Sequence, residues 1–350
     1  MADGKERTVF QKAQDRISSI ASSLTGTSTH HFPEFDQLPK VEGQPQGCLW
    51  GFFDKNGVRD EVGTLNLLSP DVVRRAASEI RTGEHVQLDW CLENVEFPGF
   101  GRKKFEQKVV DLASLGFAAL DDEVYINTQS GSQWDSLKHF AHQKSRMYYN
   151  GLSHEEAAQT TKNGIHNWCE RGGIVGRGVL VDWLSWYEKK HGDPPSAVSR
   201  HEIPVSEIDE CLKWQGTATR PGDILMIRSG YVRWHNYAPP EERRNGTEKS
   251  SKAIGLQNNE TTVRWLYGHH FAALAGDTVA FEAWPPPMET GWCLHEWLLT
   301  EWGTPIGEMW DLETLSKVCE KEGRWTFFLT SAPLHVKGGV GSPPGAIAIF

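Results

Sequence analysis

The densest group of polar side chains that could do chemistry lies in one segment, residues 127–140 (NTQSGSQWDSLKHF). Gln129, Gln133 and Asp135 are separated by even numbers of residues, so an extended chain would project them from one face. His139 would return to the same region from one turn into a following helix. A carboxylate within reach of an imidazole can bind a metal ion or hold the imidazole as a general base. From the residues alone, the segment is either such a site or a capped helix start with surface amides.

Short apolar runs bounded by Gly or Pro indicate the elements that would position this segment. Strands are expected within 178–184, 222–230, 325–333 and 345–350. Helical stretches at 293–302 and 311–322 interleave with them. This mixture predicts an α/β or α+β fold.

Local signals mark two helix starts and one loop. Ser69 can cap a helix whose first position is Pro70, and Gly83 is expected to stop it. A second helix is expected to begin at Ser153, where the sequence SHEE forms a capping-box pattern. Residues 236–259, rich in Pro, Glu and Asn, are predicted to form the longest surface loop.

The composition indicates a folded protein and argues against several classes of partner. The 350 residues are 38% hydrophobic and 11% aromatic, which suffices for a sizeable core. The formal charge is −10 without a basic stripe, which argues against a nucleic-acid partner. No apolar run approaches the ~18 residues of a spanning helix, which argues against a membrane partner. Six scattered cysteines without CxxC spacing suit reduced thiols in the cytoplasm.

The N-terminal region differs from the rest of the chain. Residues 1–24 fit a short amphipathic helix better than a signal peptide, because they are charged and lack an apolar core. Residues 25–46, rich in Ser, Thr, Pro and Gly, are typical of an arm that leads into the folded part. Nothing marks a linker between independently folding halves, so a single domain is expected.

Tryptophan is abundant, with fifteen residues. Most are expected in the core, because aromatic side chains bury the most apolar area. Trp134, Trp284 and Trp292 stand beside charged or amide residues. They could line a pocket for a planar or aromatic ligand, which points to a small-molecule substrate.

The segment SGSQWDSLKHF resembles a motif of the cyclase family, which includes kynurenine formamidase and isatin hydrolase. The family carries His-x-Gly-Thr-His-x-Asp-x-x-x-His, and this chain keeps Gly131, Asp135 and His139, with Ser132 in place of the Thr. Further stretches resemble the family in the same order over nearly the whole folded chain. They lie at 50–84, 177–183, 220–230, 275–282, 294–315 and 332–349.

The resemblance implies a fold and an organisation of the chain. The fold is a compact α/β domain of the swivelling β/β/α type, a single domain with a mixed sheet flanked by helices and the site at one end. This catalytic domain would span residues 46–350, preceded by a partly flexible N-terminal arm at 1–45. The resemblance also implies a homodimer or larger homo-oligomer.

The resemblance also assigns roles to individual residues. Asp135 matches the carboxylate that ligates a metal, and His139 matches the histidine that acts as general base or proton shuttle. His295 and Glu308 match the C-terminal His and Glu that complete the site. Asp135, His295 and Glu308 are therefore the expected metal ligands. Asp277 and Glu282 are weaker candidates, because a pair of acids at the edge of a strand could be purely structural.

The chain departs from the family motif at two positions. Gln129 and Gln133 stand where the family has histidine ligands. A neutral amide oxygen is a weak, hard ligand compared with imidazole, so zinc affinity should fall steeply. Either a divalent ion, Mn²⁺, Zn²⁺ or Mg²⁺, is still held by the remaining ligands, or no metal binds and the two glutamines bind the substrate.

Three functions stay open on this reading. The first is a hydrolase of a small aromatic or cyclic amide, formamide or lactone that uses metal-activated water. The second is a metal-independent cyclase, dehydratase or isomerase of a secondary metabolite that uses the Asp135–His139 pair. The third is a non-catalytic small-molecule binder, against which four retained ionisable groups argue. A nucleotide cofactor is not expected, because the glycine-rich stretch 338–342 lacks the lysine of a phosphate loop.

Overall fold

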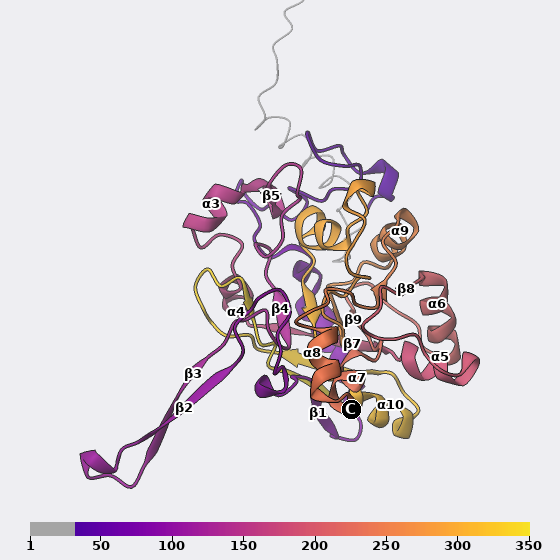
Figure 1. Ribbon diagram of the computed structural model, residues 1–350. Coiled ribbons are helices and arrows are strands. Elements are labelled where there is room, and N and C mark those ends of the chain that lie inside the picture. Colours follow the sequence, from indigo (N-terminus) through magenta and orange to yellow (C-terminus); the bar gives the residue numbers. More distant parts are fainter. Residues whose placement is uncertain (1–31) are drawn as a thin grey trace, which may run out of the picture.

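The computed structural model describes residues 32–350, so the expected helix in residues 1–24 lies outside the described part. A curled, mixed nine-stranded sheet forms the centre of a mixed α/β domain with flanking helices (Figure 1). In spatial order its strands are β1 (His85–Gln87), β15 (Ala346–Ile349), β13 (Thr326–Ser331), β7 (Ile174–Val181), β9 (Ile224–Ile227), β11 (Ala273–Gly276), β12 (Ile306–Glu308), β4 (Gln133–Asp135) and β14 (Gly341–Ser342).

The middle of the sheet is parallel and its two ends are antiparallel. β7, β9, β11 and β12 pair in parallel, whereas β1, β15 and β13 on one side and β4 and β14 on the other pair antiparallel. Parallel strands are covered on both faces and therefore read as continuous apolar runs. The strand ILMI of β9 is fully buried in this way. The four predicted strand regions are confirmed as β7, β9, β13 and β15.

Helices cover the sheet, with α5, α6 and α9 gathered on one side of it (Figure 1). The helices are α2 (Pro70–Ala76), α3 (His154–Gln159), α4 (His166–Glu170), α5 (Trp183–His191), α6 (Val205–Trp214), α7 (Tyr231–Tyr237), α8 (Pro240–Gly246), α9 (Glu260–His269) and α10 (Glu313–Glu322), with a π-helix, η8, at Glu296–Trp302. The helices expected at 293–302 and 311–322 are confirmed as η8 and α10.

Both predicted helix caps are present. The Ser69 hydroxyl accepts from the amide of Val72, and the Ser153 hydroxyl accepts from the amide of Glu156. The expected stop at Gly83 is wrong, because α2 ends at Ala76 and tightens into a 3₁₀ turn. That turn, Ala77–Glu79, brings the buried Glu79 carboxylate to Thr326 at the start of β13 and to Arg324 just before it.

Residues 236–259 are not the long loop that the sequence predicted. They contain α8 and the short strand β10 (Gly255–Leu256), which pairs with β8 (Glu202–Ile203). The Pro and Glu residues that suggested a loop are also signals for a helix start. Pro240 occupies the first turn of α8, and Glu241 and Glu242 favour its positive N-terminal end.

The described part of the predicted N-terminal arm packs on the domain. Phe32, Phe35 and Leu38 are buried, and the Phe32 ring stacks on Phe52 and His270. From Phe32 onward this segment is therefore part of the core. No helix among residues 32–350 combines the length and apolarity that crossing a bilayer requires.

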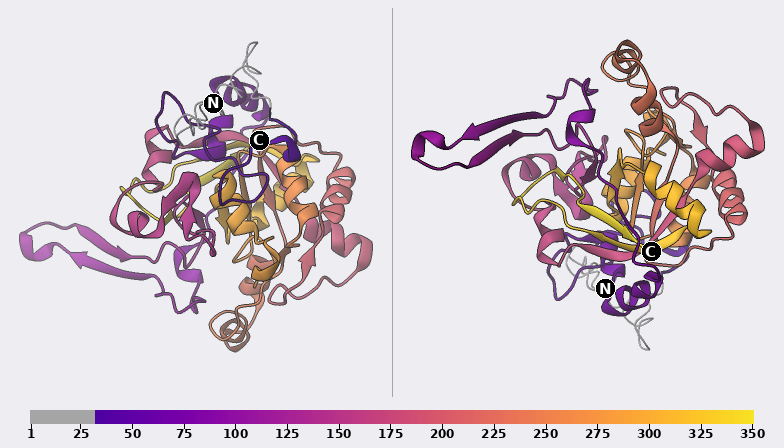
Figure 2. Two further views of the ribbon diagram at one scale, coloured as in Figure 1. Left: turned by 90° about the horizontal axis from the view of Figure 1, so that it is seen from above. Right: turned by 90° about the horizontal axis from the view of Figure 1, so that it is seen from below.

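A long β-hairpin projects from the domain (Figures 1 and 2). Its strands are β2 (Glu106–Asp111) and β3 (Leu120–Tyr125), paired antiparallel over their full length. The sequence reasoning did not find it. Its polar–apolar pattern buries nothing against the domain, so the usual indication of a strand is weak.

Candidate active site

Strand β4 presents alternate side chains to two environments. It lies between β12 and β14, with Gln133 opposite Glu308 and Asp135 opposite Gly341. Trp134, between them, points to the other face and is fully buried. Its ring packs edge-on against Trp310 at 4.8 Å between centroids, and its Nε1 donates to Ser331 Oγ at 2.9 Å. The predicted role of Trp134 in the pocket is therefore corrected: it is a core residue.

An acid and two imidazoles converge beside β4. Among residues 32–350, Asp135, His139 and His295 each offer one ligand atom, and these atoms lie within 4.8 Å of one another. His139 Nε2 is 4.0 Å from Asp135 Oδ2. His139 reaches this position from a turn, closed by its amide on the carbonyl of Ser136, and not from the helix that the sequence predicted.

His295 is held from both sides by carboxylates. Its Nδ1 lies 2.5 Å from Glu282 Oε1, and its Nε2 lies 3.2 Å from Glu308 Oε1. Burial alone would lower the pKa of His295, but the two carboxylates raise it well above its ordinary value. Glu308 lies on strand β12, whereas the sequence predicted that it would lie in or beside a helix. Burial and the charge of Asp135 raise the pKa of Glu308.

Glu282, a weak candidate in the sequence, organises the segment that carries His295. Its carboxylate accepts from the amides of Leu294 and His295 at 2.6 and 2.9 Å and from the side chain of Asn258. Asp277, its supposed partner, points elsewhere, because its carboxylate accepts from Ser229 and Gly230. Glu282 therefore positions a site residue, whereas Asp277 is structural.

The two glutamines form a hydrogen-bond relay between carboxylates. Gln129 Nε2 donates to Asp135 Oδ1 at 2.7 Å, and its Oε1 accepts from Gln133 Nε2 at 2.9 Å. Gln133 Nε2 also donates to Glu308 Oε2 at 2.7 Å. Because an ionised carboxylate only accepts, the Asp135 contact fixes the orientation of both amides. The nitrogens of both side chains are thus engaged with acceptors of the protein.

The remaining oxygen atoms fit a divalent cation. Asp135 Oδ2 and Gln133 Oε1 are buried without a hydrogen-bond partner. Three buried carboxylates, those of Asp135, Glu282 and Glu308, surround two imidazoles, so negative charge is in excess. Such orphaned oxygens and unbalanced charge are costly unless a cation or a donor is present. Asp135 and His295 would hold the ion, with Gln133 Oε1 and Glu308 as further oxygen donors and His139 beside it.

His139 stands at the boundary between the cluster and solvent. Its side chain is 18% exposed, whereas that of Asp135 is fully buried. Burial lowers the pKa of His139, the Asp135 carboxylate opposes that shift, and His295 and Arg102 add to it. The imidazole is thus favoured in its neutral form, which is the form that can accept a proton.

Aromatic side chains surround the cluster. The Phe140 ring lies 5.2 Å from that of His295, and Trp284 meets His295 edge-on at 5.9 Å. Phe100 in turn meets Trp284 at 5.9 Å. An open pocket of about 310 Å³ begins at His139 and Phe140 and extends to Gln143, Arg146, Tyr148 and His154. Trp284 is not among the residues that line this pocket and meets the cluster only through its contact with His295, whereas Trp292 stacks on Trp297 at 5.7 Å.

Arg102 is a cation near the site that the sequence reasoning missed. Its Nη1 donates to the carbonyl of Gln129 at 2.6 Å, and its guanidinium lies 4.7 Å from the centre of the Phe100 ring. Together with Phe100 and Gln129 it lines a narrow cleft that contains no carboxylate among its lining residues. No motif singles it out, because it belongs to a basic run, RKK, that reads as a solvated loop.

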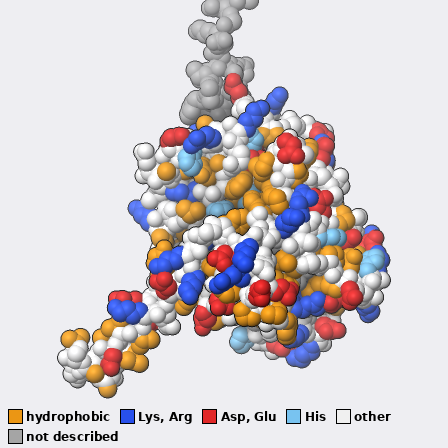
Figure 3. All heavy atoms as spheres, in the orientation of Figure 1, with side chains coloured by type: hydrophobic (Ala, Val, Ile, Leu, Met, Phe, Trp, Pro, Cys, Tyr) orange, Lys and Arg blue, Asp and Glu red, His pale blue; other side chains and the backbone are white. Residues whose placement is uncertain are grey.

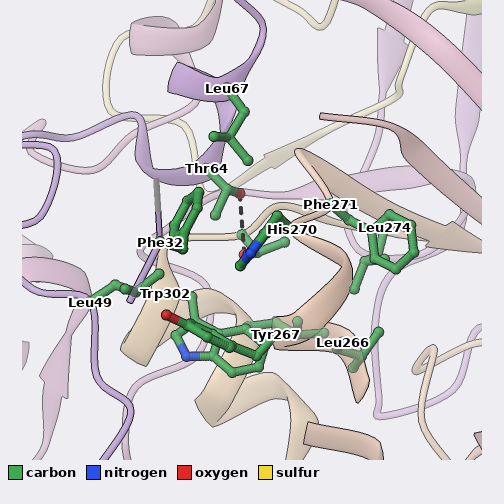
Figure 4. Close-up of a pocket in the computed structure, with 12 residues that line it drawn as sticks. Phe32, Leu49, Thr64, Leu67, Leu266, Tyr267, His270, Phe271, Leu274 and Trp302 are labelled. Atoms are coloured by element: carbon green, nitrogen blue, oxygen red, sulfur yellow. Dashed lines mark hydrogen bonds between the residues drawn. The ribbon is translucent and has the colours of Figure 1, made fainter. Parts of the chain in front are cut away.

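A separate apolar pocket lies away from this cluster (Figure 4). Phe32, Leu67, Tyr267 and Trp302 are among its lining residues, and none of the predicted site residues lines it. Its volume of about 20 Å³ accommodates roughly one water molecule. It is a packing defect of the core and too small for a substrate.

Comparison with known proteins identifies the family. The sequence matches the family model described as "Putative cyclase" over residues 29–283. The chain belongs to the cyclase family. A crystal structure of a novel cyclase is similar to this cyclase-family chain, with 29% identity and a TM-score of 0.74 over 87% of this chain and 99% of that one.

More distant structures share the fold of this cyclase-family chain. Isatin hydrolase A from Ralstonia solanacearum is 15% identical, with a TM-score of 0.54 over 79% of this chain and 94% of that one. Isatin hydrolase A from Labrenzia aggregata, bound to benzyl benzoate, is 17% identical, with a TM-score of 0.55 over 81% and 98%. No curated protein is significantly similar to the chain.

Proposed function

We propose that this cyclase-family chain is a metal-dependent hydrolase that opens an amide, formamide, imide or lactone bond of a small aromatic or cyclic substrate. The observation that carries the proposal is the meeting of Asp135, His139 and His295 within 4.8 Å beside an aromatic pocket. The likeness to two isatin hydrolases, whose names state a hydrolytic activity, supports the reaction class. We also propose that the mixed α/β domain is of the swivelling β/β/α type.

Each side chain would have a defined task in such a reaction. A bound divalent ion would supply Lewis acidity, which polarises a carbonyl and lowers the pKa of water. Asp135 and His295 would hold the ion, the latter through Nε2 after that nitrogen has given up its proton. His139, neutral and partly exposed, would accept the proton at Nε2 and return it to the leaving nitrogen or oxygen. Phe140 and Trp284 would stack against the substrate ring and exclude water.

A second candidate is a metal-independent cyclase or dehydratase. It is favoured by the relay, because Gln129 and Gln133 replace the two imidazoles of the family motif and use their nitrogens on carboxylates. In that reaction His139 would remove a proton from the substrate, and a protonated carboxylic acid, Glu308, would give one to the departing hydroxyl as water. Elimination of this kind needs no ion.

Elemental analysis and a chelator titration separate the two candidates. Protein purified without chelator should contain about one equivalent of Mn²⁺, Zn²⁺ or Mg²⁺ per chain, and hydrolysis of isatin or an aryl formamide should stop with chelator and return with metal. Turnover that persists in metal-free protein contradicts the hydrolase and supports the second candidate. Absence of any turnover on these compounds by metal-loaded protein also contradicts it.

Matched variants test the site itself. Asp135→Asn and His139→Ala should each lower kcat/KM by at least about 100-fold, the usual scale of general acid–base catalysis. Asp277→Asn is the control, because this aspartate is equally buried but bonded to Ser229 and Gly230. Its activity per folded molecule should stay near that of the natural chain. Equal losses in all three variants would mean that the cluster has no special role.

A further inference from the structure

The β2–β3 hairpin displays apolar side chains to solvent along its whole length. Six of the sixteen exposed large apolar side chains among residues 32–350 lie on it, with exposed fractions of 50–68%. They are Val109, Leu115, Phe117, Leu120, Val124 and Tyr125. Figure 3 shows hydrophobic atoms gathered on this projection. A contiguous exposed apolar surface of this kind marks an interaction site.

The domain gives the hairpin no support. Within residues 32–350, the hydrogen bonds and ion pairs of the hairpin join its own two strands, its turn or the adjoining Lys103. Figures 1 and 2 show it standing clear of the domain in three views. A two-stranded hairpin alone is at best marginally stable in water, and packing on a further surface is needed to hold it.

A second exposed apolar group lies on the loop that precedes β14. Leu334, Val336 and Val340 are 47%, 53% and 41% exposed, and Figures 1 and 2 place this loop on the same side of the molecule as the hairpin. The loop carries Lys337 and His335 and no acid. Residues 106–125 carry five acids and one lysine, so their formal charge is −5 + 1 = −4.

We propose that the hairpin is a dimerisation arm that docks on the loop 334–340 of a second copy of this chain. Apolar side chains on both surfaces would become buried, and the acidic arm would face the basic loop. Because the two surfaces lie on one side, a two-fold axis lets each copy give and receive an arm. In a reciprocal exchange each copy would bury its own arm and the loop that receives the other arm, so both surfaces of both copies would contribute to the interface.

Docking of the arm would also affect the catalytic cluster, because both docking surfaces connect to it through the backbone. The carbonyl of Val340 accepts from the amide of Ser136 at 3.0 Å, and Gly341 pairs with Asp135 in the sheet. The arm begins just beyond Arg102 and ends just before Gln129, which both line the cleft beside the site. Dimerisation would thus brace both segments that flank the cluster. This inference stands independently of the proposed reaction.

The oligomeric state of the full chain tests the proposal. In analytical ultracentrifugation at micromolar concentration, the natural chain should sediment at twice its mass of 39.4 kDa. Leu115→Asp with Phe117→Asp at the arm tip should weaken the dimer at least 100-fold and give a monomer. Val58→Asp and Tyr237→Asp are matched controls, since these side chains are 69% and 83% exposed elsewhere, and both should stay dimeric. A monomeric natural chain, or a dimer that the tip variant leaves intact, overturns the proposal.

Two further measurements keep the test decisive. A shortened arm, with residues 109–122 replaced by Asn-Gly between the paired Lys108 and Glu123, should fold with an unchanged circular dichroism spectrum and be monomeric. A photo-cross-linker in place of Phe117, in a mixture of isotopically light and heavy chains, should link to residues 334–340 of the other chain. Linkage within one chain, or to a different surface of the partner, overturns the docking site.

Discussion

Replacement of Glu282 by glutamine should both destabilise the fold and impair the site. The natural carboxylate accepts from the amides of Leu294 and His295, from His295 Nδ1 and from the amide group of Asn258. A glutamine keeps one acceptor oxygen and brings an NH₂ group that faces donors. At least two of these donors are therefore left without an acceptor in a fully buried position.

The expected magnitude follows from that loss. Each donor that is left unsatisfied in a buried site costs about 1–3 kcal/mol, and more when a charge was involved. The substitution also removes one of the two carboxylates that raise the pKa of the buried His295 imidazole, so its protonated form is less stabilised. We expect the free energy of unfolding to fall by about 3–5 kcal/mol, which corresponds to a decrease in Tm of roughly 4–7 °C in a domain of this size.

Urea and thermal denaturation followed by circular dichroism provide the measurement. Glu188→Gln is the control, because this glutamate is 38% exposed and pairs with Arg233 on the surface. Such a pair contributes about 0–1 kcal/mol, so the control should unfold close to the natural chain. A loss below about 1 kcal/mol for Glu282→Gln would refute the view that this carboxylate holds the His295 segment in place.

Three further substitutions have expected outcomes. Burial raises the pKa of Glu301 to about 8, so the folded state favours the protonated acid. The contribution of this group to the free energy of unfolding is therefore fully present below the unfolded pKa near 4.5 and is lost as the pH rises to about 8. The stability of Glu301→Gln relative to the natural chain should therefore rise by about 1 kcal/mol per pH unit across that window in urea titrations, and a constant difference would contradict the assignment. Trp134→Phe should cost about 1–2 kcal/mol, through the lost bond to Ser331, and leave KM unchanged in steady-state kinetics, whereas a changed KM would return this residue to the pocket. In Gly341→Ala, the new Cβ would lie 2.6 Å from Gln129 Nε2, so kcat should fall by at least tenfold in the same assay, and full activity would show that the relay is dispensable.

Signals that act within a few residues were read correctly from the sequence. The caps at Ser69 and Ser153 and the buried strands β7 and β9 depend on local hydrogen bonds and on continuous apolar runs. The residues that meet at the cluster were identified through family resemblance, since more than 150 residues of chain separate Asp135 from His295 and no local pattern connects them.

Other features depend on tertiary contacts that the sequence does not display. Glu282 matters because Leu294 and His295 turn their amides toward it, and a strand-edge acid carries no sign of that. The core position of Trp134, by contrast, could have been predicted, because the alternation that places Gln133 and Asp135 on one face of the strand places Trp134 on the other. The β2–β3 hairpin buries nothing within its own chain, so hydrophobic periodicity could not reveal it.

The alternation along β4 sets very different tolerances for length changes in neighbouring segments. One extra residue between Gln133 and Asp135 would turn the acid into the core and leave its place beside His139 to an aromatic ring or a backbone group. The hairpin before it can gain or lose pairs of residues at its tip without moving either of its ends. Among homologous chains, insertions and deletions should therefore accumulate around residues 112–119 and stop abruptly before Gln129.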